Sequence, residues 1–183
     1  MFYSDTHSGP GGYHQFVLYD FTCLGFIAET YNAIVNGITQ SIVDAHNSMF
    51  TGRIFISETE VSSAGVNRSP KAYLNNPQAE RNKFSGDVDR TMTTMRFVNS
   101  VNQPMGAFSW LAIHAVSMNN SNQLVSSDNF GYASIQLEAE YNPNELVGQG
   151  TFIGAFCSAH SADISPNIMG PRCQVSCSTI LVR

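Results

Sequence analysis

The stretch AFSWLAI (Ala107–Ile113) is short and apolar, which predicts a buried strand. A second run of the same kind, TFIGAFC (Thr151–Cys157), predicts another buried strand. Between the two, NFGYASIQLEAEY (129–141) predicts a helix for which Ser127 or Asp128 serves as the cap. Strands that alternate with helices in this way predict an α/β protein, built as a layered sandwich.

The first half of the chain adds a helix and two strands to this prediction. Short strands are expected at Arg53–Ser57 and Thr93–Val98, and the turn formers within 62–86 predict loops. No repeat or linker divides the chain, so 1–183 is treated as one domain. The predicted helix carries apolar residues at helical spacing: Ile27, Tyr31, Ile34, Val35, Ile38, Ile42 and Val43.

The composition excludes some partners. Charged residues make up 13% of the 183, about half the usual share, and the net charge is −5. With no block of Lys or Arg, we expect no nucleic-acid partner and no polybasic contact with anionic lipid. No apolar run approaches the ~18 residues of a membrane-spanning helix, and the first residues do not resemble a signal peptide.

The cysteines and the chain ends support further expectations. Cys23 and Cys157 lie in apolar surroundings and are interpreted as buried thiols. Cys173 and Cys177 lie in a polar stretch and are interpreted as members of disulfides, with each other or with other partners. Two glycosylation sequons, at Asn67 and at Asn119, weakly favour a secreted protein. Both ends of the chain have the appearance of truncation within a larger domain.

Sites in open α/β sheets form at the carboxyl ends of strands. His114 directly follows the predicted strand Ala107–Ile113, so it is a candidate metal ligand; a buried core histidine is the alternative. Ser165 follows the other strand and is a candidate active-site serine, or else a helix cap before Pro166.

Two further residues belong to loops. His7 lies in a stretch rich in Gly and Pro, where it can bind a metal or polarise a carbonyl, or simply lie at the surface. Arg68 can bind a carboxylate or stabilise an oxyanion; the alternative is an arginine on a surface turn with no role in a site. No Gly-x-Ser-x-Gly or His-Glu-x-x-His motif is present. The residues alone therefore indicate an α/β domain with a hydrolytic site as one hypothesis.

Taken together, six segments resemble the neutral/alkaline ceramidase family, in the family's order and over almost the whole chain. These enzymes are zinc-dependent amidases that split ceramide into sphingosine and a fatty acid. The resemblance implies a partial catalytic domain with truncated ends, because the family's enzymes are much longer. The matching segments are THSGPGGY (6–13), NRSP (67–70), YLNNPQAER (73–81), SWLAIHAVSM (109–118), SDNFGYAS (127–134) and DISPN (163–167).

The resemblance also implies roles. His114 matches a zinc ligand and Ser165 matches the serine assigned as the nucleophile. His7 and Arg68 match residues that contact the substrate or stabilise the oxyanion. It further implies ceramide as the lipid substrate, Zn²⁺ as the cofactor, and a secreted or extracellular location, with any peripheral membrane contact made by parts of the enzyme beyond these 183 residues.

Two positions depart from the family pattern. Where the family has a zinc-binding His, this chain has Asp5, whose carboxylate is a different kind of zinc ligand. Where the family has Gly before the Asp-x-Ser-Pro-Asn motif, this chain has Ala162. The resemblance implies that the family's remaining zinc ligands, a Glu and a Tyr, correspond to positions beyond Arg183. Three hypotheses stay open: a ceramidase represented by part of its chain, an inactive ceramidase-like copy, and an unrelated structural or binding domain.

Overall fold

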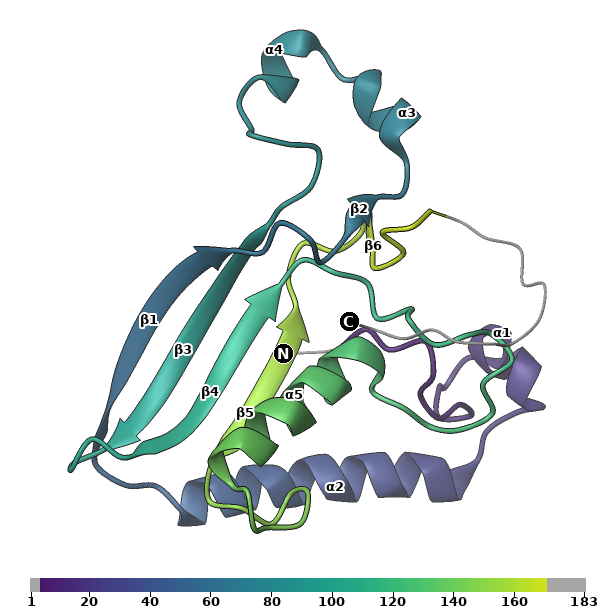
Figure 1. The fold of residues 1–183 in the computed structure, drawn as a ribbon. Helices are drawn as coiled ribbons and strands as arrows, with labels where there is room; N and C mark the ends of the chain where they lie inside the picture. The colour runs from purple at the N-terminus through teal and green to yellow at the C-terminus, as the bar shows by residue number, and fades with distance from the viewer. Residues whose placement is uncertain (1–3, 171–183) are drawn as a thin grey trace.

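A computed structural model describes residues 4–170, and its centre is a mixed four-stranded sheet (Figure 1). The strand order is β1-β3-β4-β5. Strands β1 (Gly52–Glu60), β3 (Thr91–Asn99) and β4 (Pro104–Leu111) pair antiparallel, whereas β5 (Ile153–Ser158) runs parallel to β4.

The parallel pair is joined by helix α5 (Asp128–Tyr141), which packs against β5 (Figure 1). A parallel connection needs such a crossover, and a helix supplies it. Polar side chains of the helix reach the strand backbone: Glu138 Oε1 accepts from Gly154 N at 3.0 Å, and Ser134 Oγ accepts from Phe156 N at 3.1 Å. The helix thereby fixes the position of β5 as well as covering it.

A two-stranded antiparallel sheet lies near the end at which β4 and β5 finish (Figure 1). It pairs β2 (Val66–Asn67) with β6 (Ile164–Ser165). After β2 the chain leaves as a separate lobe that holds the short helices α3 (Pro70–Leu74) and α4 (Gln78–Arg81), and it returns to begin β3.

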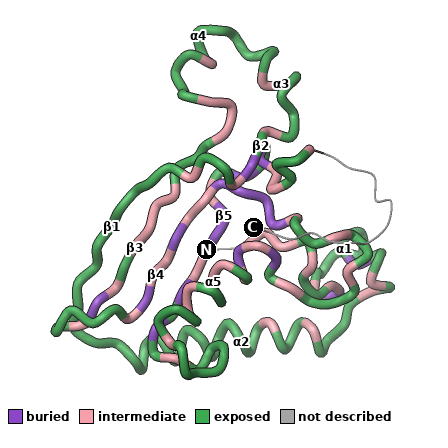
Figure 2. Tube along the Cα trace, viewed as in Figure 1, coloured by how far each residue is buried: buried purple, intermediate pink, exposed green. Residues whose placement is uncertain are grey.

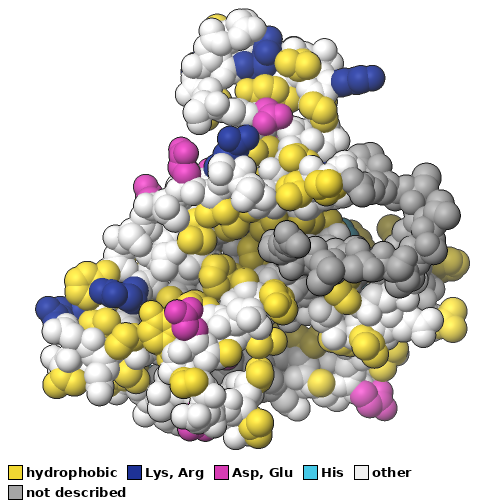
Figure 3. All heavy atoms as spheres, in the orientation of Figure 1, with side chains coloured by type: hydrophobic (Ala, Val, Ile, Leu, Met, Phe, Trp, Pro, Cys, Tyr) yellow, Lys and Arg dark blue, Asp and Glu magenta, His cyan; other side chains and the backbone are white. Residues whose placement is uncertain are grey.

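The N-terminal third contains helix α1 (Val17–Asp20), the 3₁₀ helix η1 (Phe21–Cys23) and the long helix α2 (Ala28–Asn47). No residue of α2 is buried, and every residue of β1 is exposed (Figure 2). The apolar stripe predicted for this helix therefore faces solvent; Ile42, for example, is 64% exposed. Hydrophobic side chains also reach the surface of the face drawn in Figure 3.

The buried part of the described chain is small and concentrates after β4. Ile113, Ala115 and Phe130 form one cluster, against which Leu111 and Phe156 pack. This cluster links the end of β4 to the start of α5 and to β5. Among residues 4–170, no helix is long and apolar enough to cross a membrane.

The predicted α/β fold is confirmed, and the predicted strands and helices are all present. The boundaries differ most at β4, which was expected at Ala107–Ile113 and lies at Pro104–Leu111, and at β1, which extends from the expected Arg53–Ser57 to Gly52–Glu60. Residues 62–86 were expected to be loop, but they contain β2, α3 and α4. Pro70 occupies the first turn of α3, where its missing N–H costs no hydrogen bond.

The structure also tests the predictions made for Ser165 and for the cysteines. Ser165 is not a helix cap, because it lies in β6 and its Oγ accepts a hydrogen bond from Asn167 N at 3.1 Å, in a local turn. Cys157 is a buried free thiol as predicted, whereas the free Cys23 is half-buried. Cys173 and Cys177 lie outside the described residues.

Candidate metal centre

His114 lies in a buried turn just after β4. All of 112–115 is buried, and His114 itself is 9% exposed. Its ring Nδ1 lies 2.5 Å from the carbonyl oxygen of Ser161, and its own carbonyl accepts from Asn129 Nδ2 at 2.9 Å. A carbonyl only accepts hydrogen bonds, so Nδ1 carries the hydrogen and Nε2 is left for another partner.

The N-terminal segment crosses the same place. Thr6 Oγ1 donates to the carbonyl of Ser126 at 2.6 Å, and His7 N donates to the carbonyl of Ala115 at 3.3 Å. Asp5 has a φ of 58°, a left-handed conformation that Asp tolerates better than most residues. These contacts hold the segment against the turn that carries His114.

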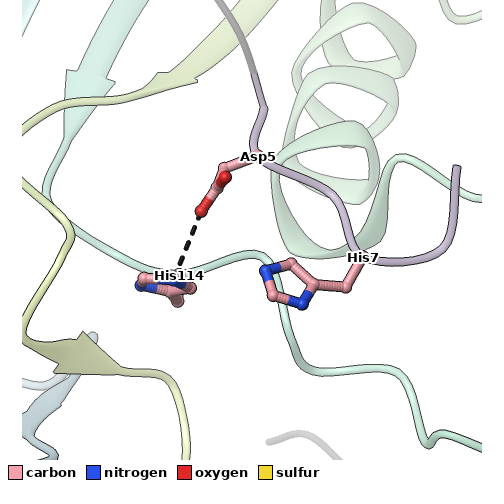
Figure 4. A group of neighbouring side chains, drawn as sticks. All are labelled: Asp5, His7 and His114. Atoms are coloured by element: carbon pink, nitrogen blue, oxygen red, sulfur yellow. Dashed lines mark ion pairs between the residues drawn. The ribbon is translucent and has the colours of Figure 1, made fainter. Parts of the chain in front are cut away.

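Asp5, His7 and His114 consequently point toward one another (Figure 4). Each offers one ligand atom, and all three atoms lie within 4.8 Å of one another. Asp5 Oδ2 lies 3.4 Å from His114 Nε2, and the two imidazole rings lie 5.7 Å apart between centroids, edge to face. We call these three residues the acid–histidine cluster.

The chemistry of the cluster fits a divalent metal ion. Because Ser161 fixes the hydrogen on Nδ1, the lone pair of His114 Nε2 faces the carboxylate of Asp5. The Asp5 carboxylate and the Nε2 lone pair would repel each other at this separation unless a cation lies between them. That cation can be a metal ion, or a proton on Nε2 that makes His114 an imidazolium. Two imidazoles and one carboxylate are ligands that zinc accepts, and three protein ligands are typical of a catalytic zinc site.

Arg68 and Ser165 are brought together by the small sheet. Val66 is the pairing partner of Ser165, and Arg68 N donates to the carbonyl of Asp163 at 2.8 Å. The segment that contains Asp163 and Ser165 also contains Ser161, which contacts His114. Within residues 4–170, neither the guanidinium of Arg68 nor the hydroxyl of Ser165 makes a hydrogen bond or ion pair with the acid–histidine cluster. We predict, from the roles that the family resemblance implies, that His7, Arg68, His114 and Ser165 share one pocket, and these contacts do not test it.

Three further residues shape this region, and the sequence pointed to only one of them, Asp128, as a helix cap. Ser161 and Asn129 contact His114 from either side, and the buried carboxylate of Asp128 accepts hydrogen bonds from the N–H groups of Ser117 and Met118. The strand-end rule pointed to the segment of Ser161, but its role rests on a main-chain carbonyl, which no residue type reveals.

The profile of the family described as neutral/alkaline non-lysosomal ceramidase, N-terminal, matches residues 3–180. The chain belongs to this family. Similar relatives include the neutral ceramidase of Drosophila pseudoobscura pseudoobscura, which is 50% identical over 171 residues; the match covers 93% of this chain and 24% of that protein. The family predicted from the sequence is thereby confirmed.

Solved structures of ceramidases are also similar to the chain. The neutral ceramidase from Pseudomonas aeruginosa is 37% identical, with a TM-score of 0.78, over 88% of this chain and 25% of that one. A structure described as a ceramidase complexed with C2 is 36% identical, with a TM-score of 0.79, over 90% and 24%. The chain thus spans about a quarter of the length of the ceramidases that it matches.

Proposed function

We propose that this chain is part of the catalytic domain of an amide hydrolase of sphingolipid metabolism, which cleaves ceramide into sphingosine and a free fatty acid. The observation that carries the proposal is the acid–histidine cluster at the carboxyl end of β4, within a chain that belongs to the ceramidase family. One of the similar solved structures is described as a ceramidase complexed with C2, which supports a ligand-binding role for this domain.

Asp5 and His114 would hold the zinc ion, with His7 within reach as a third ligand. Zinc polarises a carbonyl and activates water when it is bound in such a site. His7 and Arg68 would stabilise the negative charge that develops on the amide oxygen. Ser165 either attacks the amide carbon or positions water and ceramide.

The catalytically inactive alternative is favoured by one observation. A carboxylate stands at position 5, where the family pattern has a histidine, and it contacts His114 at 3.4 Å. An ion pair between Asp5 and a protonated His114 would occupy the place of the metal. The two hypotheses differ in whether the cluster retains zinc.

The proposal also covers the location and the partners of the protein. We propose a secreted protein or one on the extracellular face of the plasma membrane, with no nucleic-acid partner. Peripheral membrane contact is assigned to parts of the enzyme beyond this chain. The 183 residues alone are expected to be marginally stable, since α2 and β1 expose apolar side chains.

A chimera tests the function. Residues 4–170 replace the matching segment of the Drosophila melanogaster neutral ceramidase, a relative 49% identical over 171 residues. We expect the chimera to release fatty acid from ceramide and to lose this activity with a chelator. His114→Ala is the matched loss-of-function variant, and the isolated 183-residue chain is expected to be inactive. A folded chimera that retains zinc but releases no fatty acid would contradict the proposed function, whereas one that retains no zinc would support the inactive alternative.

A further inference from the structure

The ring of His114 depends on a carbonyl 47 residues away in the chain. Nδ1 lies 2.5 Å from the oxygen of Ser161, and both residues are buried. The side chain of Ser161 plays no part in that hydrogen bond. Its geometry therefore depends on the position of the main chain at Ser161.

Ser161 is held by three hydrogen bonds. Its hydroxyl accepts from the hydroxyl of Ser158 at 2.5 Å, and both serines are buried, at 7% and 8% exposure. Its N–H donates to the carbonyl of Ala159 at 3.0 Å, and its carbonyl also accepts from Ile164 N at 3.2 Å. A buried hydroxyl pair is costly to leave half-made, so the two serines stabilise one conformation of the loop.

We propose that Ser161 is a positioning residue for His114, locked in place by the hydroxyl of Ser158. The inference rests on the proposed function, because it gives His114 the task of presenting Nε2 to a metal ion. Histidines that bind metals commonly donate their other ring hydrogen to a carbonyl or carboxylate, which fixes the tautomer and the ring plane. Ser161 supplies that acceptor here.

The ring and the backbone of His114 have separate supports, which makes the role of Ser161 specific. Asn129 Nδ2 donates to the carbonyl of His114 at 2.9 Å and to Ser117 Oγ at 3.1 Å. These bonds hold the main chain of the turn. Loss of the Ser158–Ser161 pair therefore loosens the ring while the turn stays in place.

The test uses the chimera in its metal-free form, with ¹⁵N-labelled histidine, and assigns the signal of His114 from its loss in His114→Asn. We expect the unchanged protein to show the Nδ1–H tautomer. Ser158→Ala and Ser161→Ala are expected to shift His114 toward a mixture of tautomers and to weaken zinc binding about tenfold, by chelator competition. Because the hydroxyls act as a pair, the double variant is expected to lose no more than either single variant.

Ser109→Ala is the matched control. Ser109 is 2% exposed, and its hydroxyl pairs with that of the half-buried Thr94 at 2.9 Å, without a hydrogen bond to His114. We expect it to leave the tautomer and the zinc affinity unchanged. An Nε2–H tautomer in the unchanged chimera would overturn the inference, and so would equal effects of Ser109→Ala and Ser161→Ala. Since no readout uses ceramide, failure of the proposed hydrolysis is a separate result.

Discussion

The carboxylate of Asp5 lies 3.4 Å from Nε2 of His114, although 109 positions separate the two residues in the chain. The pair is part of the acid–histidine cluster, and residue 5 is one of the two positions at which this chain departs from the family pattern. The consequences can be measured on the chimera.

The first prediction concerns the ligand at position 5. Asp5→Ala removes one of the two proposed zinc ligands of this chain, so zinc affinity is expected to fall at least about tenfold, or about 1.4 kcal/mol. Asp5→His restores the family's ligand and is expected to strengthen binding. Chelator competition measures both. If Asp5→Ala binds zinc as tightly as the unchanged chimera, Asp5 is not a ligand.

The second prediction separates the two roles open to His7. As a ligand, His7 contributes to zinc affinity; as an oxyanion donor, it contributes to kcat alone. We expect His7→Gln, which keeps a donor group, to leave zinc affinity unchanged and to lower kcat less than His7→Ala does. Equal losses of zinc by both variants would instead identify His7 as a third ligand. Zinc affinity and steady-state kinetics supply the two readouts.

The third prediction concerns the small sheet of β2 and β6, which holds Arg68 beside the segment of Ser165. A Cβ on Gly65 would lie 2.6 Å from the side chain of Ile164 and 2.9 Å from the carbonyl oxygen of Ser165. Gly65→Ala is therefore expected to destabilise the protein by about 1–3 kcal/mol, as overpacking does. Urea unfolding measures the loss, and Gly37→Ala, on exposed α2 with open space around the Cβ position, is the control expected to be neutral or stabilising.

The fourth prediction concerns Asp128, which is 5% exposed and has a φ of 55°. Its carboxylate accepts from the N–H groups of Ser117, Met118 and Asn129 at 2.9, 2.8 and 2.6 Å. Asp128→Asn tolerates the same backbone conformation but turns an NH₂ group toward these donors. We expect a loss of about 1.5–3 kcal/mol in the free energy of unfolding. A loss below about 0.5 kcal/mol would mean that the loop does not depend on the charge.

The fifth prediction concerns pH. The hydrogen bond from the backbone N–H of Thr91 lowers the pKa of Asp89 below its usual 3.8, with smaller help from the Thr91 hydroxyl and from His160, against the opposing effect of burial. A lowered folded-state pKa gives stability that is present above the unfolded pKa and is lost as the pH falls through the folded pKa. Asp89→Asn is therefore expected to lower the melting temperature near pH 6, and its difference from the unchanged protein is expected to shrink as the pH falls below 3.8.

The sequence predicted the strands because short apolar runs are typical of strands, although β1 is exposed along its whole length. It underestimated β1, whose last three residues, Glu58–Glu60, are polar and exposed yet pair with the start of β3. Backbone pairing, not side-chain burial, extends that strand. His114 lies just after β4, where the strand-end rule expects a site, because that position depends on chain direction alone; its role as a metal ligand stays a prediction. The rule could not find Ser161, because a carbonyl belongs to every residue and only the tertiary fold shows which one meets a ring.

The groups around His114 lie far apart in the sequence, and this distance affects the order in which the site folds. The hairpin of β3 and β4 closes through a short turn, but the contacts of His114 span 47 residues to Ser161 and 109 to Asp5. Contacts that close long loops form late, because the chain loses the entropy of the loop before the contact stabilises the structure. We therefore expect the ligands to assemble only after β5 has docked, so that metal uptake during refolding lags behind the formation of secondary structure and reports the last step of folding.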